Sequence, residues 1–178
     1  IAVLLLFLAF TTHGYFSQEN LTDLFLANTP VMLISLGMTL IILTGEIDIS
    51  VGSTFAICSV LMGISARAGM SDVASGLVAC LVGAACGALN GALVAYLRVP
   101  SIVVTLATMV ALRDGRRWAT QGSWIENLPR NFQWMGLTQP GYTVITIAVV
   151  ALLIGTTAAG LHFLRIGRAV FATGSNQA

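Results

Sequence analysis

The sequence predicts an all-α fold, a polytopic transmembrane helical bundle with about six membrane segments, some of them short or broken. Hydrophobic residues make up 57% of the 178 residues and charged residues only 8%, whereas ordinary soluble domains carry about 25% charged residues. The mean hydropathy is +0.91, and the apolar residues fall into runs that approach the ~20 residues needed to cross a bilayer. A soluble fold of this length has too little interior to hide so much apolar surface.

The N-terminal part contains the first two predicted segments. Residues 1–16 are expected to end a first membrane helix, and residues 17–23 to form a polar connection in which Asn20 can cap the next helix. Residues 24–44 are long enough to cross a membrane. Pro30 lies within them and is expected to kink or restart the helix, because proline lacks the backbone donor that a helix interior needs.

The next two segments flank a short turn. Residues 51–66 are apolar but short for a membrane span, and Arg67 and Gly69 are expected to end them. Ser71 or Asp72 can cap the long segment that follows, residues 73–97.

The long segment carries a stripe of small residues. Gly83, Gly87 and Gly91 recur at four-residue spacing, which allows a neighbouring helix backbone to approach closely in lipid. Asn90 lies beside this stripe and can hydrogen-bond across helices. Helix packing is therefore the predicted role of the three glycines.

Charge interrupts the fifth segment. Residues 101–112 are strongly apolar but make only half a span, and Arg113, Asp114, Arg116 and Arg117 follow at once. This pattern fits a discontinuous helix lining a cavity, or an arginine cluster whose side chains reach the membrane interface. Asp114 and Arg117 stand three residues apart and can pair on a helix.

The C-terminal part consists of one long connection and one span. Residues 118–141 hold all three tryptophans, which are expected at the headgroup level. Residues 142–164 form the last clear span, and Arg165 and Arg168 follow it. The distribution of arginines among the connections does not fix the orientation of the chain.

The turn between the second and third segments is the main candidate for function. Gly45 can take the left-handed conformation that closes a helix, and Asp48 or Ser50 can accept amides at the start of the next helix, which opens at Val51. This turn is either an interfacial cap between two helices or a place where Glu46 or Asp48 faces a cavity, as acids near lipid usually do.

The sequence lacks the motifs of enzymes, metal sites and nucleic-acid-binding proteins. The sequence contains no HExxH or GxSxG motif and no GxxxxGK[ST] loop, so the chain is expected neither to act as an enzyme nor to hydrolyse ATP itself. The three cysteines lack metal-ligand spacing, and no metal or cofactor is predicted. The formal net charge of +1 gives no indication of nucleic-acid binding.

Three motifs carry a family resemblance. The run MTLIILTGEIDISVGS, residues 38–53, resembles the MTxVILTGGIDLSVGS motif of the bacterial sugar ABC-importer permeases of the ribose type, with Glu46 in place of a glycine and Ile49 in place of a leucine. Residues 87–109 resemble the GxxNGxLVAxxxxPxFIVTLxTM region, and residues 167–178 resemble the opening of the cytoplasmic coupling stretch, GRxxYAxGxNxxAA. The sequence is most similar to the rhamnose-type and autoinducer-2-type branches.

This resemblance implies an importer subunit. The chain would be a single transmembrane permease domain, 1–178, the N-terminal and central part of a longer protein truncated at both ends, in the bacterial inner membrane. It would translocate a monosaccharide or similar small neutral solute. Its partners would be cytoplasmic ABC ATPase subunits, a periplasmic sugar-binding protein, a second permease copy or paralogue, and membrane lipid.

The resemblance also assigns residues to roles. The motif turn would comprise Gly45, Glu46, Asp48, Ser50 and Gly52. Candidates for the translocation path are Asn90, Thr105, Thr108 and Arg113, the first three because they offer hydrogen bonds without fixed charge. Coupling to the ATPase would use Gly167, Arg168, Gly174 and Asn176.

Two other functional classes remain open. An ion-coupled secondary carrier would use Glu46, Asp48 or Asp114 as a proton or sodium site. A membrane anchor or scaffold would transport nothing.

Overall fold

The computed structural model describes residues 2–12, 14–130, 132 and 136–175, and its regular structure over these ranges is helical. This confirms the predicted fold class. The helices of the described ranges are α1 (Ala2–Thr11), α2 (Gln18–Leu43), α3 (Val51–Arg67), α4 (Asp72–Leu97), α5 (Ser101–Thr120), α6 (Gln139–Phe163) and α7 (Arg165–Ser175).

The predicted membrane segments correspond to α1 through α6. Among the described residues, α2, α4 and α6 are long and apolar enough to cross a membrane, with 26, 26 and 25 residues. Helix α3 is a shorter apolar helix of 17 residues, about 26 Å at 1.5 Å per residue. The bundle therefore combines three full-length spans with one shorter apolar helix among the described residues.

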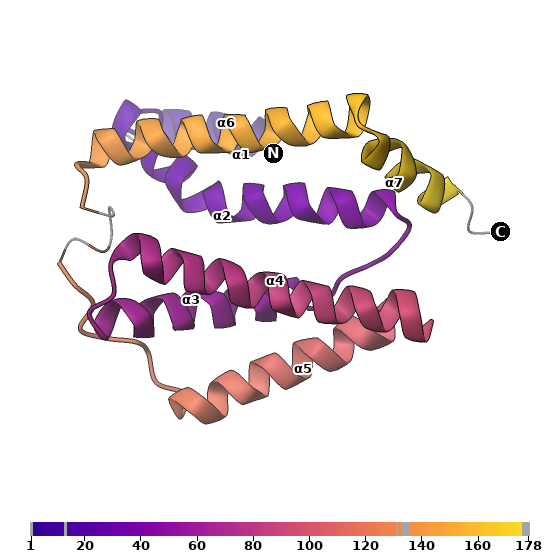
Figure 1. Cartoon of the computed structure of the whole chain (residues 1–178). Coiled ribbons are helices and arrows are strands. Elements are labelled where there is room, and N and C mark those ends of the chain that lie inside the picture. The colour runs from indigo at the N-terminus through magenta and orange to yellow at the C-terminus, as the bar shows by residue number, and fades with distance from the viewer. Residues whose placement is uncertain (1, 13, 131, 133–135, 176–178) are drawn as a thin grey trace.

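The helices pack in two groups. Helices α3, α4 and α5 contact one another, and α2, α6 and α7 do the same. Figure 1 shows these groups as two layers, with α7 and the connection between α2 and α3 at the same end of the bundle. The connections from α3 to α4 and from α5 to α6 lie at the other end. The segment between α2 and α3 thus joins the two layers.

The buried side chains are unusual for a protein core. Among the described residues, the buried hydrophobic side chains are those of Ala66, Val104 and Val150. The buried polar side chains are those of Ser50, Ser75, Asn90 and Thr105. Large apolar side chains are exposed along the long helices, as expected for surfaces that meet lipid or further protein. Polarity is therefore concentrated inside the bundle.

The start of α2 differs from the prediction. The helix begins at Gln18, so most of the expected polar connection is helical, and Ser17 caps it by accepting the Asn20 amide at 3.3 Å. Asn20 is not the cap, because its side chain donates backwards to the Tyr15 carbonyl at 2.6 Å. Pro30 lies inside the helix, which does not restart there.

Helix α5 is continuous, so of the two alternatives for the charged cluster the discontinuous helix is wrong, and the interfacial arginine cluster stays a prediction. It runs from Ser101 to Thr120 through the whole charged cluster. Arginine is a good helix former, so this part of the sequence supports a helix although it interrupts the apolar run. The expected Asp114–Arg117 pair does not form; Arg113 Nε instead lies 3.3 Å from Asp114 Oδ1, and both side chains are about half exposed.

The long connection is shorter than predicted at both ends. Helix α5 already contains Trp118, and α6 begins at Gln139. The rings of Trp118 and Trp124 are 85% and 89% exposed, which leaves them available to an interface; Trp134 lies outside the described residues. Ser71 caps α4 by accepting the Ala74 amide at 3.3 Å, one of the two predicted possibilities.

Candidate functional site

The candidate site is built around residues 44–50, which we call the acidic elbow. Helix α2 ends there in a Schellman motif, in which the Gly45 amide donates to Ile42 at 2.9 Å and the Glu46 amide donates to Ile41 at 3.2 Å. Gly45 has φ +79°, the left-handed conformation that glycine adopts most readily. The predicted role of Gly45 in ending the helix is confirmed.

The elbow returns into the bundle before α3 begins. Ser50, the residue before α3, contacts Asn90, which lies seven residues before the end of α4 at Leu97. Seven residues of helix correspond to about 10 Å. Figure 1 shows the connection leaving α2 and running back beside α4. Helix α3 therefore starts inside the bundle, and the discontinuous segment that the sequence suggested at α5 is found here instead.

Asp48 holds the elbow in this conformation. One of its carboxylate oxygens, Oδ1, accepts the Ser50 amide at 2.7 Å and the Ser50 hydroxyl at 2.6 Å. The Ser50 side chain does not cap α3. Of the two residues predicted to accept an amide, Asp48 does so, and the amide that it accepts is that of Ser50, one residue before α3 begins. The carboxylate also lies at the positive end of the α3 dipole, worth about 0.3–1 kcal/mol.

A chain of hydrogen bonds continues from Ser50 into α4 and α5. The Asn90 amide donates to Ser50 Oγ at 3.0 Å, and Thr108 Oγ1 donates to Asn90 Oδ1 at 2.6 Å. Only 1% of Ser50 and 6% of Asn90 is exposed. Together, Asp48, Ser50, Asn90 and Thr108 form what we call the elbow network. Buried polar groups connected in this way specify one arrangement of the surrounding helices.

The first turn of α5 holds the other side of the elbow. Ser101 Oγ lies 3.4 Å from the Ile47 amide, and Thr105 Oγ1 lies 3.4 Å from the Ile47 carbonyl oxygen. The shorter bond of Thr105 goes to its own helix, at 2.8 Å from the Ser101 carbonyl. The elbow is thus fixed by side chains from both α4 and α5.

A pocket of about 240 Å³ opens beside the elbow. Its polar lining residues are Thr44, Glu46, Asp48, Asn90, Ser101 and Thr105. This volume is below the ~300–1,000 Å³ of pockets for drug-sized ligands, so it suits a smaller solute. Gly87 and Gly91 also line the pocket.

The glycines of α4 have different surroundings. A Cβ at Gly83 would lie 3.3 Å from Cys58 Sγ on α3, whereas Cβ atoms at Gly87 and Gly91 would meet nothing within 4 Å among the described residues. Gly83 therefore lies at the α3–α4 contact, and the packing role of the other two stays a prediction. Gly52, in the first turn of α3, also has open space around it.

Arg113 lies apart from the other candidates for the translocation path. It is twelve residues along α5 from Ser101, exposed, and paired with Asp114. Asn90, Thr105 and Thr108 converge on the elbow, but Arg113 does not join them.

The predicted coupling residues fall on α7, a helix that the sequence did not reveal. Gly167 is buried, and a Cβ there would collide with backbone atoms of Gly160 and Leu161 in α6. A Cβ at Gly174 would collide with the Leu43 carbonyl oxygen and lie 3.2 Å from the Leu43 carbonyl carbon. Arg168 is exposed on the same helix, and Asn176 lies outside the described residues. Helix α7 therefore packs directly on the end of α2, next to Gly45.

Sequence reasoning missed Ser101 and the contact between α7 and α2. Ser101 stands directly after Pro100, where a helix commonly begins, and that position was the only signal for its role. No metal site is indicated, because the described residues contain no group of three or more His, Cys, Asp or Glu that could hold an ion.

Comparison with known proteins decides the family. A family model described as "Branched-chain amino acid transport system / permease component" matches residues 20–178. The chain belongs to this family. The chain is also similar to the autoinducer 2 import system permease protein LsrC of Photorhabdus laumondii, with 37% identity over 99% of this chain and 54% of the relative. The corresponding LsrC protein of Yersinia pseudotuberculosis serotype O:3 is 38% identical over 99% of this chain and 51% of its own length.

The family match and the similarity to the LsrC relatives confirm the permease resemblance seen in the motifs. The chain spans about half the length of the curated relatives that it matches. No solved structure matches it.

Proposed function

We propose that the chain is part of the membrane-spanning permease subunit of an ATP-binding-cassette importer in the bacterial inner membrane. The solute would be a monosaccharide or a similar small neutral molecule, and the LsrC relatives are named for the import of autoinducer 2. The observation that carries this proposal is the family match over residues 20–178, together with an acidic elbow that re-enters the bundle beside a polar pocket.

The partners follow from the same proposal. Cytoplasmic ATPase subunits would hydrolyse ATP, a periplasmic binding protein would deliver the solute, and a second permease copy or paralogue would complete the pore. Helix α7 would then lie on the cytoplasmic side, because it carries the residues that resemble the coupling stretch. The opposite end of the bundle, where α2 and α6 begin, would face the periplasm.

We propose that movement of α7, driven by the ATPase, reaches the solute pocket at the acidic elbow. Helix α7 rests on Leu43, two residues before Gly45, and the pocket begins at Ile41 and Thr44. A displacement of α7 would be passed to the elbow without an intervening element. The elbow network would then shift as a unit, because each of its members is bonded to the next.

Reconstitution tests the function directly. The full-length permease is placed in vesicles with its ATPase and binding protein, and accumulation of labelled autoinducer 2 and D-ribose is measured with and without ATP. We expect accumulation only when the ATPase and ATP are both present. Accumulation driven by a proton or sodium gradient without the ATPase would instead identify a secondary carrier, and no transport of any solute tested would leave the anchor hypothesis standing.

A further inference from the structure

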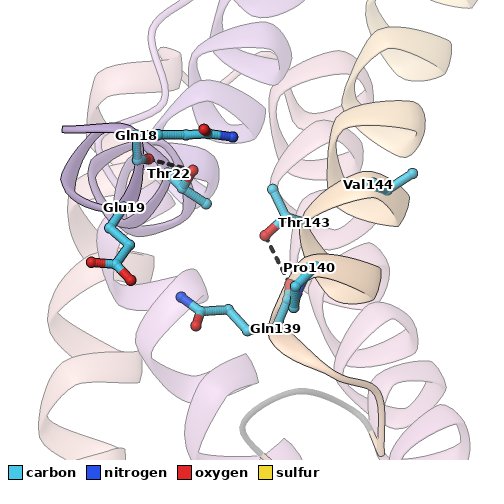
Figure 2. A pocket seen from close by; sticks show the side chains of 7 residues that line it. All are labelled: Gln18, Glu19, Thr22, Gln139, Pro140, Thr143 and Val144. Carbon is cyan, nitrogen blue, oxygen red and sulfur yellow. Dashed lines mark hydrogen bonds between the residues drawn. The ribbon is translucent and has the colours of Figure 1, made fainter. Parts of the chain in front are cut away.

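Separate hollows lie along the contact between α2 and α6, and we call this line of hollows the groove. It opens in a pocket of about 410 Å³ formed by the first turns of the two helices, with Gln18, Glu19 and Thr22 on one side and Gln139 and Thr143 on the other. Figure 2 shows the Gln139 side chain reaching from α6 toward the α2 residues across this pocket. Gln139 Nε2 also donates to Asp23 Oδ1 at 3.0 Å, which ties the two helices together at the mouth.

The groove continues toward the elbow. A second hollow, of about 460 Å³, has a polar side formed by Asn28, Ser35 and Thr39 of α2. Its apolar lining comes from Val31, Met32 and Leu36 of α2 and from Ile154 of α6. A third, of about 430 Å³, is lined by the last turns of α2, by α6 from Thr157 onward, and by α7. Ile41 and Thr44 line both this hollow and the elbow pocket, so the groove ends where the candidate site begins.

The polar side chains of α2 gather on the side that lines this groove. At 100° per residue, Gln18, Thr22, Asn28, Ser35 and Thr39 fall within an arc of about 140°. We call these five residues the α2 polar stripe. Ile34 points to the opposite side of the helix at the same depth as Ser35. None of the described residues of α2 is buried, so the stripe is open in this chain.

Exposure of this stripe to lipid is physically unfavourable. Polar side chains within a membrane span face the bundle interior or a water-filled cavity. The hydroxyls of Thr22 and Thr39 and the amide of Asn28 donate to their own helix, at 2.8, 2.8 and 2.7 Å. Their oxygen atoms still have lone pairs that can accept hydrogen bonds, and all three residues line hollows of the groove.

We propose that the α2 polar stripe is one wall of the solute conduit, and that the pocket at its mouth is an entry subsite for a neutral, hydroxylated solute. Between Asn28 and Thr39 the groove is lined by amides, hydroxyls and apolar carbon, with no charged side chain among the described residues. Such a wall offers hydrogen bonds to a polyol without fixing an ion. The proposal rests on the importer function proposed above and adds to it the path that the solute takes.

Accessibility of single cysteines tests the wall. The parent is the full-length permease with its native cysteines, Cys58, Cys80 and Cys86 among them, replaced by serine. Ser35→Cys and Asn28→Cys place a thiol on the stripe, and Ile34→Cys is the matched control one residue away. We expect a membrane-impermeant methanethiosulfonate reagent to modify both stripe variants at least tenfold faster than the control, because the reactive thiolate forms in water and not in lipid. Rates that differ less than tenfold, or no reaction at any stripe position, would overturn the proposal, since the stripe would then face lipid or protein.

Protection by added solute tests the ligand class. D-Ribose, L-rhamnose and autoinducer 2 are each expected to slow modification of Asn28→Cys at least threefold, whereas L-leucine, a zwitterion, is not. Protection by L-leucine alone, or by none of these compounds, would overturn the assignment to a neutral hydroxylated solute. ATP-driven uptake by the cysteine-free parent is measured separately. If uptake is absent while the difference in labelling rate persists, the proposed importer function is rejected, whereas the proposal that the α2 polar stripe faces water is kept.

Discussion

At the scale of single residues, Asp48 has a role that its chemistry can test. Its carboxylate accepts two bonds from Ser50 and donates none, so an amide oxygen can replace it. We expect Asp48→Asn to keep at least half of wild-type uptake. We expect Asp48→Ala to lower the free energy of unfolding by about 1.5–3 kcal/mol, the usual contribution of hydrogen bonds to a charged group.

Uptake and thermal unfolding of the purified full-length variants measure both effects. Asp114→Asn is the matched control, because this carboxylate is about half exposed and its ion pair among the described residues is with its neighbour Arg113. Its effect on stability should stay within ~0.5 kcal/mol. Complete loss of uptake in a stable Asp48→Asn variant would show that the charge itself is needed, and the elbow would then carry more than a structural cap.

Asn90 and Thr108 supply a second prediction at this scale. Both ends of the Asn90 amide are occupied, one by Ser50 and the other by Thr108, so Asn90 positions the elbow. We expect Asn90→Leu to lower stability by about 1–3 kcal/mol, because the polar groups of its partners stay buried without it.

A double-mutant cycle separates this contact from general damage. Thr108→Val removes the other partner, and the pair should show a coupling energy of about 0.5–3 kcal/mol in thermal unfolding. Strictly additive effects would mean that the bond contributes nothing beyond packing. Thr143→Val is the control, because among the described residues the Thr143 hydroxyl donates to its own helix, to the Gln139 carbonyl at 2.9 Å.

At the scale of helices, the sequence predicted the apolar spans better than their polar ends. Hydrophobic runs located α2, α4 and α6, but Gln18 and Trp118 show that helices extend into polar sequence, where the hydrophobic pattern gives no signal. Helix α7 was missed for a related reason: it is short, starts two residues after α6 ends and buries only part of one face. For α5 the sequence left a broken helix and an interfacial arginine cluster as alternatives, because the apolar run ends at Leu112 although arginine favours a helix.

The candidate site was partly predictable on the same grounds. The motif around Asp48 identified the elbow and suggested its cap. The bond between Ser50 and Asn90 joins residues 40 positions apart, and no spacing rule connects them in a single sequence. The same holds for Gly174 and Leu43, whose contact depends on how two helices dock.

The docking of α7 on α2 leads to the prediction for this scale. Because a Cβ at Gly174 would collide with the Leu43 carbonyl, Gly174→Leu must push α7 away from the elbow. We expect the amount of protein in the membrane to be unchanged and solute-stimulated ATPase activity to fall at least fivefold. Ala172→Leu is the control, since Ala172 is exposed on the same helix. Normal ATPase stimulation in Gly174→Leu would show that α7 signals to the permease by another contact.

At the scale of the whole molecule, the elbow joins two helical layers that have few other strong contacts. Helices α2, α6 and α7 form one group and α3, α4 and α5 the other, and the pocket and the network lie where the groups meet. A bundle whose buried side chains are largely polar, and whose layers meet at one such junction, is suited to rearrange there. Gly45 lies in the connection between the layers, directly after the last turn of α2, so a change of its backbone conformation would alter how the layers meet.

Gly45 is therefore the position at which stability and transport should respond together. Its φ of +79° is unfavourable for any residue with a Cβ by roughly 1–2 kcal/mol, so Gly45→Ala should lower the unfolding free energy by that amount. If the elbow is the pivot between the layers, ATP-driven uptake should fall at least fivefold, because the substitution disfavours the conformation that holds the network. Gly76→Ala is the matched control: Gly76 lies in α4 with open space around it, and alanine in a helix is favoured by about 1 kcal/mol. Gly45→Ala with lower stability but full uptake would place the pivot elsewhere in the bundle.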